Sequence, residues 1–215
     1  MNLPAKPSGR FVNARFRLLD AALGMIRARG YSATSVDQLC AAAGVTKGAF
    51  FHHFASKEAL AVAAADHWSE TTGALFAGAP YHEFADPLDR VLGYIDFRAS
   101  LLNGPIETFT CLVGTMVQEA FATSPAIRDA SNASISDYAR KLEADIASAM
   151  GLHGVTGVSA ASLAIHTQAV LQGAFILAKA RGGPEVATAS VGHLKRYFSL
   201  LFRSSQNQGK EAKHV

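Results

Sequence analysis

The chain has 215 residues, of which 49% are hydrophobic, and a formal net charge of +3. This length and apolar content suffice for one small domain and one larger domain. The sequence shows no signal-peptide pattern, and no apolar run approaches the roughly eighteen residues that span a bilayer. Two cysteines far apart do not make a disulfide framework. We therefore expect a cytoplasmic protein without a membrane partner.

Positive charge is concentrated at the N-terminal end. Residues 1–60 contain eight Lys or Arg and three Asp or Glu, a net charge of +5, whereas the remaining residues contain twelve against fourteen, a net charge of −2. Cationic side chains that bind phosphates release counterions from a nucleic acid. Any contact with nucleic acid is therefore expected in the first sixty residues.

The first predicted helix covers residues 15–29. Its apolar residues follow the spacing of one helix face: Leu19, Ala22, Leu23 and Ile26. Gly30 ends this helix, because glycine adopts the left-handed cap without a Cβ clash. Thr34 or Ser35 then offers a side-chain oxygen to the free N–H groups that open the next helix.

Residues 36–54, VDQLCAAAGVTKGAFFHHF, predict two short helices joined by a turn at Gly44. Thr46 caps the second helix, and this layout is typical of a helix-turn-helix that binds the DNA major groove. Lysine donates to guanine O6 and N7, and glycine lets the backbone approach the groove floor. The predicted DNA-binding residues are Thr34, Ser35, Thr46, Lys47, Gly48, Phe51, His52, His53 and Lys57.

No metal site is predicted. His52 and His53 are adjacent, so their side chains diverge by roughly 100° on a helix, and no cysteine partner lies nearby.

Residues 15–68 resemble the DNA-binding domain of the TetR family of bacterial transcriptional regulators (TetR/AcrR type). The family usually has tyrosine where this chain has Phe51, which replaces a possible phosphate contact with an apolar one. The matching segments are Gly30-Tyr31, Thr34-Ser35-Val36, Ala42-Ala43-Gly44-Val45-Thr46-Lys47-Gly48, His53-Phe54 and Ser56-Lys57-Glu58-Ala59-Leu60.

After residue 60 the sequence predicts helices only. Asp86 is expected to cap a helix that has Pro87 at its first position, the favoured place for proline. The helix that begins at Ser56 is predicted to continue to about residue 75. Further helices are predicted over 106–122, 124–150, 158–181 and 184–202.

The fold prediction is an all-α protein in which an N-terminal three-helix helix-turn-helix domain precedes a larger C-terminal helical domain for ligand binding and dimerisation. A flexible N-terminal arm at 1–10 either contacts DNA through its basic residues or is plainly disordered. The predicted boundaries are 1–10 for the arm, 11–55 for the DNA-binding domain, 56–203 for the larger domain and 204–215 for a flexible tail.

The last predicted helix has an apolar seam with 4-3-4-3 spacing, formed by Ala187, Val191, Leu194, Phe198 and Leu201. The resemblance implies that the last two helices of each subunit form a four-helix dimer interface, so these residues are predicted at that interface. The alternative is that the seam packs only within the monomer. A homodimer would read a palindromic site in double-stranded DNA.

The resemblance also implies a cavity for a small-molecule effector of unknown identity. The candidate lining residues are Trp68, Tyr94, Phe97, Arg98, Phe109, Cys111, Met116, Tyr138, Gln168, Gln172 and Phe175. Arg98 is costly to bury without an anionic partner, which is either a ligand carboxylate or a protein acid such as Glu119. Gln168 and Gln172 lie one turn apart and suit either a polar ligand or hydrogen bonds between subunits.

The segment from Thr110 to Glu119 resembles one branch of the family in which a cysteine at the place of Cys111 senses oxidants or electrophiles. The alternative is that Cys111 is a small apolar residue.

The functional prediction is a homodimeric repressor that a small-molecule effector releases from its operator. The alternatives are a redox- or electrophile-sensing repressor that uses Cys111, and an activator without a small-molecule ligand. An enzyme is not expected, because the sequence contains no paired carboxylates, Ser/His/Asp arrangement, phosphate loop or metal cluster. No cofactor is expected.

Overall fold

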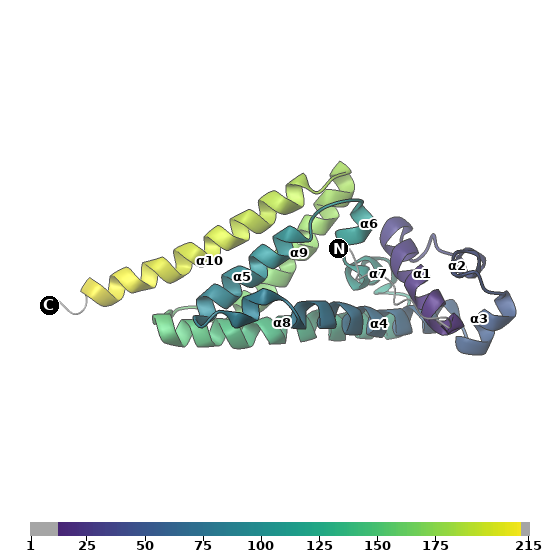
Figure 1. Cartoon of the computed structure of the whole chain (residues 1–215), viewed down its shortest axis with the longest axis horizontal. Helices are drawn as coiled ribbons and strands as arrows, with labels where there is room; N and C mark the ends of the chain where they lie inside the picture. Colours follow the sequence, from purple (N-terminus) through teal and green to yellow (C-terminus); the bar gives the residue numbers. More distant parts are fainter. Residues whose placement is uncertain (1–12, 212–215) are drawn as a thin grey trace. The chain divides into compact units, whose positions relative to one another are not determined.

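The computed structural model describes residues 13–211, with side chains described as far as Arg203 (Figure 1). The described residues form helices and connecting loops without a strand, which confirms the predicted all-α class. The predicted N-terminal arm at 1–10 lies outside the described residues.

The chain divides into two compact units. The first contains the described N-terminal residues through Phe76 and residues 104–134, and the second contains residues 77–103 and the chain from Ile135 onward. These units differ from the predicted domains, because residues 104–134 group with the N-terminal helices, of which the first packs on the helices at 106–109 and 112–120.

The first unit begins with four helices: α1 Ala14–Arg29, α2 Val36–Ala43, α3 Lys47–His53 and α4 Lys57–Ala77. In α1, the side chains at the predicted apolar spacing are buried, and the helix packs on α2, α3 and the helical segments at 106–109 and 112–120. Ser35, and not Thr34, caps α2: its hydroxyl accepts from the Gln38 N–H (3.2 Å) while the Gln38 side chain accepts from the Ser35 N–H (2.9 Å). This reciprocal pair fixes the start of α2.

The single helix predicted over 106–122 is wrong. The structure has a short helix α6 at Ile106–Phe109, a break, and then α7 at Leu112–Ala120. Thr110 and Cys111 are extended at the break, and the Cys111 sulfur accepts a hydrogen bond from the Gly114 N–H (3.4 Å). Cys111 therefore acts as the N-cap of α7, a role usually filled by Ser, Thr, Asp or Asn.

The second unit contains the 3-10 helix η1 Pro80–Glu83, α5 Pro87–Ser100, α9 Ala160–Arg181, α10 Glu185–Glu211 and most of α8 Pro125–His153. Asp86 caps α5 as predicted, since its carboxylate accepts from the Leu88 N–H (2.8 Å). Both α8 and α10 extend beyond their predicted ends, α8 by three residues to His153 and α10 to Glu211, within the predicted tail.

The prediction that the apolar seam of α10 lies at the dimer interface names the wrong face of this helix. Four of its five residues, Ala187, Val191, Leu194 and Phe198, are at most 3% exposed in the single chain, and Leu201 is half-buried. They are covered because α10 packs on α9 and α5 of the same chain, and the three helices lie close together in Figure 1. The seam therefore belongs to the core of the second unit.

Helix α9 is long enough and apolar enough to span a membrane by length and composition alone, contrary to the expectation that no segment would be. It packs on α10 and buries one of its faces within the second unit.

Candidate nucleic-acid interface

The recognition helix α3 is held by its cap and by one buried aromatic ring. The Thr46 hydroxyl accepts from the Ala49 N–H (3.1 Å), and Gly44 adopts the left-handed conformation (φ 60°) that turns the chain after α2. Phe50 is fully buried, with its ring centroid 5.9 Å from that of Phe54. These contacts fix one side of α3 in the protein and leave its opposite side free for a partner.

The opposite side of α3 carries most of the predicted contact residues. Lys47, Gly48, Phe51 and His52 are exposed, whereas His53 is half-buried. Phe51 is 52% exposed, although its ring edge contacts Phe50 with centroids 5.1 Å apart. A large apolar ring presented to solvent beside a cation is suited to thymine methyl groups and sugars.

Lys47 forms an ion pair with Asp37 of α2 in which Nζ and Oδ1 are 2.9 Å apart. Both side chains are mostly exposed, so this pair is weak and solvent competes with it. The ammonium group can therefore leave Asp37 for a stronger acceptor at little cost.

Gly48 is not required by the protein itself. A Cβ at this position would meet nothing closer than the Thr46 hydroxyl at 3.8 Å, which is an ordinary contact. Glycine in a helix also costs about 0.5–1 kcal/mol relative to alanine. Nothing in the chain itself therefore requires glycine at this place, where the lack of a side chain leaves the backbone open to close approach by a partner.

The prediction that Thr34 contacts DNA is wrong for its side chain. Thr34 is 1% exposed, and its hydroxyl donates to the Gly30 carbonyl (2.7 Å). The neighbouring Ser35 is exposed but uses its hydroxyl in the α2 cap. Lys57 is also engaged within the protein, because its Nζ donates to the Tyr31 and Thr34 carbonyls, both at 3.1 Å.

Two exposed arginines of α1 are candidate contacts that the sequence reading missed. Arg17 donates from Nη1 to the Gly44 carbonyl in the turn before α3 (3.3 Å), and the Arg15 guanidinium lies 5.7 Å from the Phe54 ring centroid. Both therefore lie beside the helix-turn-helix, where phosphate contacts fix orientation. The positive net charge of the first sixty residues was the sequence feature that could have identified these two arginines as candidates.

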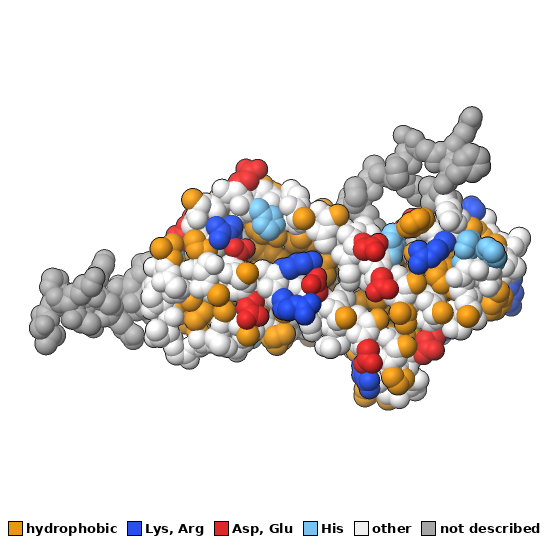
Figure 2. All heavy atoms as spheres, turned by 90° about the horizontal axis from the view of Figure 1, so that it is seen from below, with side chains coloured by type: hydrophobic (Ala, Val, Ile, Leu, Met, Phe, Trp, Pro, Cys, Tyr) orange, Lys and Arg blue, Asp and Glu red, His pale blue; other side chains and the backbone are white. Residues whose placement is uncertain are grey.

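Charged and hydrophobic side chains are interspersed on the face shown in Figure 2, where Lys and Arg alternate with Asp and Glu. Across the described residues, His, Cys, Asp and Glu form no group of three that could hold a metal ion.

The predicted effector-lining residues belong to both compact units. Trp68, Phe109, Cys111 and Met116 belong to the first unit, and the other seven belong to the second. In the first unit Trp68, Phe109 and Met116 are buried, whereas Cys111 is half-buried.

The first unit contains a buried cation. Arg27 of α1 is 5% exposed; its Nε donates to the Leu23 carbonyl (2.9 Å), and its guanidinium lies 5.0 Å from the Trp68 ring centroid. Burial lowers the pKa of Arg27 to about 10, against the opposing charges of Cys111 and Glu107. Arg27 therefore stays protonated at neutral pH.

The predicted partner of Arg98 is corrected in part. Both Glu119 oxygens accept backbone hydrogen bonds of the α1–α2 loop, whereas Arg98 donates from Nε to the Tyr94 hydroxyl (2.9 Å). The guanidinium also lies 5.3 Å and 5.5 Å from the ring centroids of Tyr94 and Tyr138. Arg98 is therefore stabilised by aromatic rings.

The aromatic group around Tyr94 also includes Tyr81 and Phe97, whose ring centroids lie 6.1 Å apart. The ring of Tyr81 meets that of Tyr94 edge to face, with centroids 5.8 Å apart, and burial raises the pKa of Tyr81.

In α9, Gln168 is 5% exposed and its Nε2 has no hydrogen-bond partner. A buried donor of this kind costs free energy unless something accepts its hydrogen bond.

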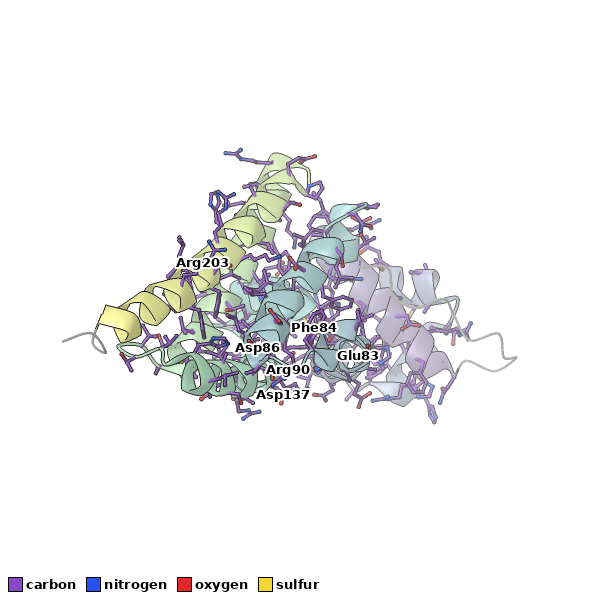
Figure 3. The ribbon with its side chains drawn as sticks, turned by 60° about the vertical axis from the view of Figure 1, so that its left-hand side comes forward. Glu83, Phe84, Asp86, Arg90, Asp137 and Arg203 are labelled. Atoms are coloured by element: carbon purple, nitrogen blue, oxygen red, sulfur yellow. The ribbon has the colours of Figure 1, made fainter. Side chains whose placement is uncertain are left out.

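A separate polar group lies at the start of α5, where Figure 3 labels Phe84, Asp86 and Arg90. His153 Nε2 is 2.9 Å from each carboxylate oxygen of Asp86. Arg90 donates from Nε to Asp145 (2.7 Å) and from Nη1 to the Phe84 carbonyl (3.0 Å). The hydrogen bond to His153 is the main cause that lowers the pKa of Asp86.

The capped turn, the buried Phe50 and the exposed face of α3 define a DNA-binding protein of the helix-turn-helix class. Residues 18–64 match bacterial regulatory proteins of the tetR family, and residues 87–186 match the C-terminal domain of LmrA/YxaF-like transcriptional regulators. The chain belongs to the TetR family of bacterial transcriptional regulators. Its family and fold are those of transcription regulators and not of enzymes.

Individual relatives agree with this assignment. The A-factor receptor protein of Streptomyces griseus is 36% identical over 69 residues, which are 32% of this chain and 25% of that protein. The chain matches a quarter or less of the length of its curated relatives. A TetR-family regulator from Agrobacterium tumefaciens has a TM-score of 0.74 at 20% identity, covering 86% of this chain and 96% of that one. A TetR regulator from Chloroflexus aurantiacus has a TM-score of 0.74 at 25% identity, covering 86% and 94%.

Proposed function

We propose that this regulator is a cytoplasmic homodimeric repressor that inserts α3 of each subunit into the DNA major groove. The observation that carries the proposal is the exposed Lys47-Gly48 tip on a helix whose other side is anchored by Phe50. Lysine at this tip supplies donors for guanine, and glycine permits close approach. Lys47, Gly48, Phe51 and His52 are the proposed base-reading residues, with Arg15 and Arg17 on phosphates.

The dimer interface is proposed on the other faces of α9 and α10. Large apolar side chains there are exposed in the single chain, which favours burial against a second copy. They are Ile165, Ile176, Leu177, Tyr197 and Leu200, of which Leu200 is the most exposed at 61%. A two-fold pair places two recognition helices on a palindromic operator.

The test of DNA recognition is Lys47→Ala, assayed by fluorescence anisotropy on a duplex selected from a randomised pool. Removing the lysine should cost about 1–3 kcal/mol of specific binding. Lys141→Ala is the matched control, because Lys141 is an exposed lysine of α8 that pairs with Asp137. Equal affinities of the two variants would contradict the assigned recognition helix.

We further propose that the second unit takes a small-molecule effector whose binding favours a state that releases DNA. The orphaned Nε2 of Gln168 and the Arg98 guanidinium among aromatic rings support this assignment. One relative, the A-factor receptor protein of Streptomyces griseus, is named as a receptor, which is in keeping with an effector site.

Release by an effector can be measured as loss of anisotropy while a library of small polar and aromatic compounds is titrated. A compound that releases the wild-type protein should release Gln168→Leu more weakly, because the hydrogen bond is lost. A reporter promoter that carries the selected site distinguishes repression from activation without a small-molecule ligand, since only a repressor lowers basal transcription.

Sensing of electrophiles through Cys111 is the second candidate function. The half-buried sulfur caps α7, so part of the thiol is accessible to a small reagent. The sulfur would form a bond to the alkene carbon of N-ethylmaleimide, while the carbon–carbon π bond breaks and the other carbon takes a proton from water. The second cysteine, Cys40, is buried, and burial raises its pKa.

Cys111→Ser tests this candidate, because serine retains an N-cap for α7. N-ethylmaleimide should release wild-type protein from the selected duplex and leave Cys111→Ser bound. Release of the variant at the same rate would exclude Cys111 as the sensor.

A further inference from the structure

The loop between α1 and α2 is hydrogen-bonded to a residue that lies outside the helix-turn-helix. Glu119 is near the end of α7, and its carboxylate accepts two successive backbone N–H groups of the loop. Tyr31 N–H donates to Oε1 (3.1 Å) and Ser32 N–H donates to Oε2 (2.7 Å). Hydrogen bonds to an ionised acceptor are roughly twice as strong as neutral ones.

The Glu119 carboxylate lies against Gly30, at the place that a side chain of this residue would occupy. This residue has φ 92°, a conformation that side chains disfavour, and a Cβ there would collide with the Glu119 carboxyl group. The Gly30 carbonyl also accepts from the Thr34 hydroxyl. Glycine is therefore favoured by the backbone conformation, and a Cβ there would displace the Glu119 carboxyl group from its present position.

A cation holds the same loop from α4. Lys57 Nζ donates to the Tyr31 and Thr34 carbonyls and lies 4.3 Å from the Tyr31 ring centroid. The loop backbone is thus fixed by an anion from α7 and a cation from α4. Ser35, the cap of α2, follows directly, and α2 packs on α3. The loop therefore leads directly into the cap of α2, and α2 in turn contacts the recognition helix.

We propose that Glu119 is a positioning residue that ties the recognition helix to α7, so that a change in α7 alters operator binding. The inference rests on the proposed DNA-binding function. It also gives a route from Cys111 to the helix-turn-helix, because Cys111 caps the helix that contains Glu119.

The test compares Glu119→Ala and Glu119→Gln with Gln118→Ala in the full chain. Gln118 is the matched control, since its side chain is exposed and donates only to the Gly114 carbonyl of its own helix. Three quantities are measured for each variant: amide hydrogen exchange of residues 30–35, affinity for the selected duplex, and affinity for a duplex of unrelated sequence.

Glu119→Ala should accelerate exchange at Tyr31 and Ser32 and weaken binding to the selected duplex by about tenfold, the loss expected for charge-assisted hydrogen bonds. Binding to the unrelated duplex should change little, because it depends on phosphate contacts. Glu119→Gln should fall between, since its amide oxygen still accepts one hydrogen bond, and Gln118→Ala should match the wild type.

Two results would overturn the proposal. The first is wild-type exchange and wild-type affinity in Glu119→Ala. The second is a general loss in which exchange rises equally in α9 and both duplexes bind more weakly, because that pattern indicates reduced stability alone. If the wild type itself selects no duplex, the proposed function fails, whereas the exchange measurement still decides whether Glu119 holds the loop.

Discussion

At Gly48, what favours folding and what favours the proposed binding of DNA are different residues. The protein leaves room for a Cβ at this place, and the helical backbone does not require glycine. Gly48→Ala should therefore raise stability by about 0.5–1 kcal/mol through higher helix propensity. The same methyl group should weaken binding to the selected duplex by holding α3 away from the groove.

The measurement is a urea unfolding curve together with duplex affinity for the same variant. Opposite signs of the two changes are expected. If Gly48→Ala binds the duplex as tightly as the wild type, α3 does not approach the groove floor at this residue.

Asp86 gives a pH-dependent contribution to stability. Its pKa is lowered in the folded state, chiefly by the hydrogen bond from His153, so its stabilising effect is present above the unfolded pKa of about 3.9 and is lost as pH falls through the lower folded value. Between pH 7 and pH 3, the wild type should lose more stability than Asp86→Asn, which keeps an N-cap but cannot titrate.

Urea midpoints at the two pH values check this expectation. The comparison isolates Asp86 from the other carboxylates, because both proteins share them. An identical loss of stability in the two proteins would show that the pair with His153 contributes nothing.

At the scale of elements, the helices could be predicted from capping residues and apolar spacing. Which face of a helix packs within the chain and which remains exposed could not be predicted. The seam of α10 has the spacing of a packed helix, and that spacing is the same whether the neighbour is another helix of the chain or a second subunit. The structure shows Leu194 buried within the chain and Leu200 exposed.

The two faces of α10 should respond differently to substitution. Leu194→Ala should destabilise the fold by about 2–5 kcal/mol, because it opens a cavity in the core. Leu200→Glu should leave secondary structure intact and shift the protein from dimer to monomer. Urea unfolding and light scattering measure the two effects, and a dimeric Leu200→Glu at micromolar concentration would remove this face from the interface.

The break between α6 and α7 was missed for a physical reason. Thr110 and Cys111 are compatible with a helix interior, and the preference for an extended break arises from tertiary contacts, including burial of Thr110. Cysteine is not a usual N-cap, so no local signal marked the start of α7. Glu119 could not be assigned for the same reason, because its partners are 87 and 88 residues away in sequence.

At the scale of the whole molecule, the sequence alone was sufficient to predict the helix-turn-helix and the family, because their turn, caps and charge are local features. Contacts between distant residues were not predictable. Thr34 and Lys57 were assigned to DNA, yet both hold the α1–α2 loop, and the two compact units do not follow the predicted domain boundaries.

The most direct test of paired recognition helices is selection of binding sites from randomised duplex DNA, with the mass of the complex measured by light scattering. The selected sequences should contain an inverted repeat with half-site centres about 10 base pairs, or a multiple of that, apart, and two chains should bind each site. Enrichment of no common sequence at moderate salt would contradict sequence-specific recognition. A single half-site bound by one chain would contradict the dimer.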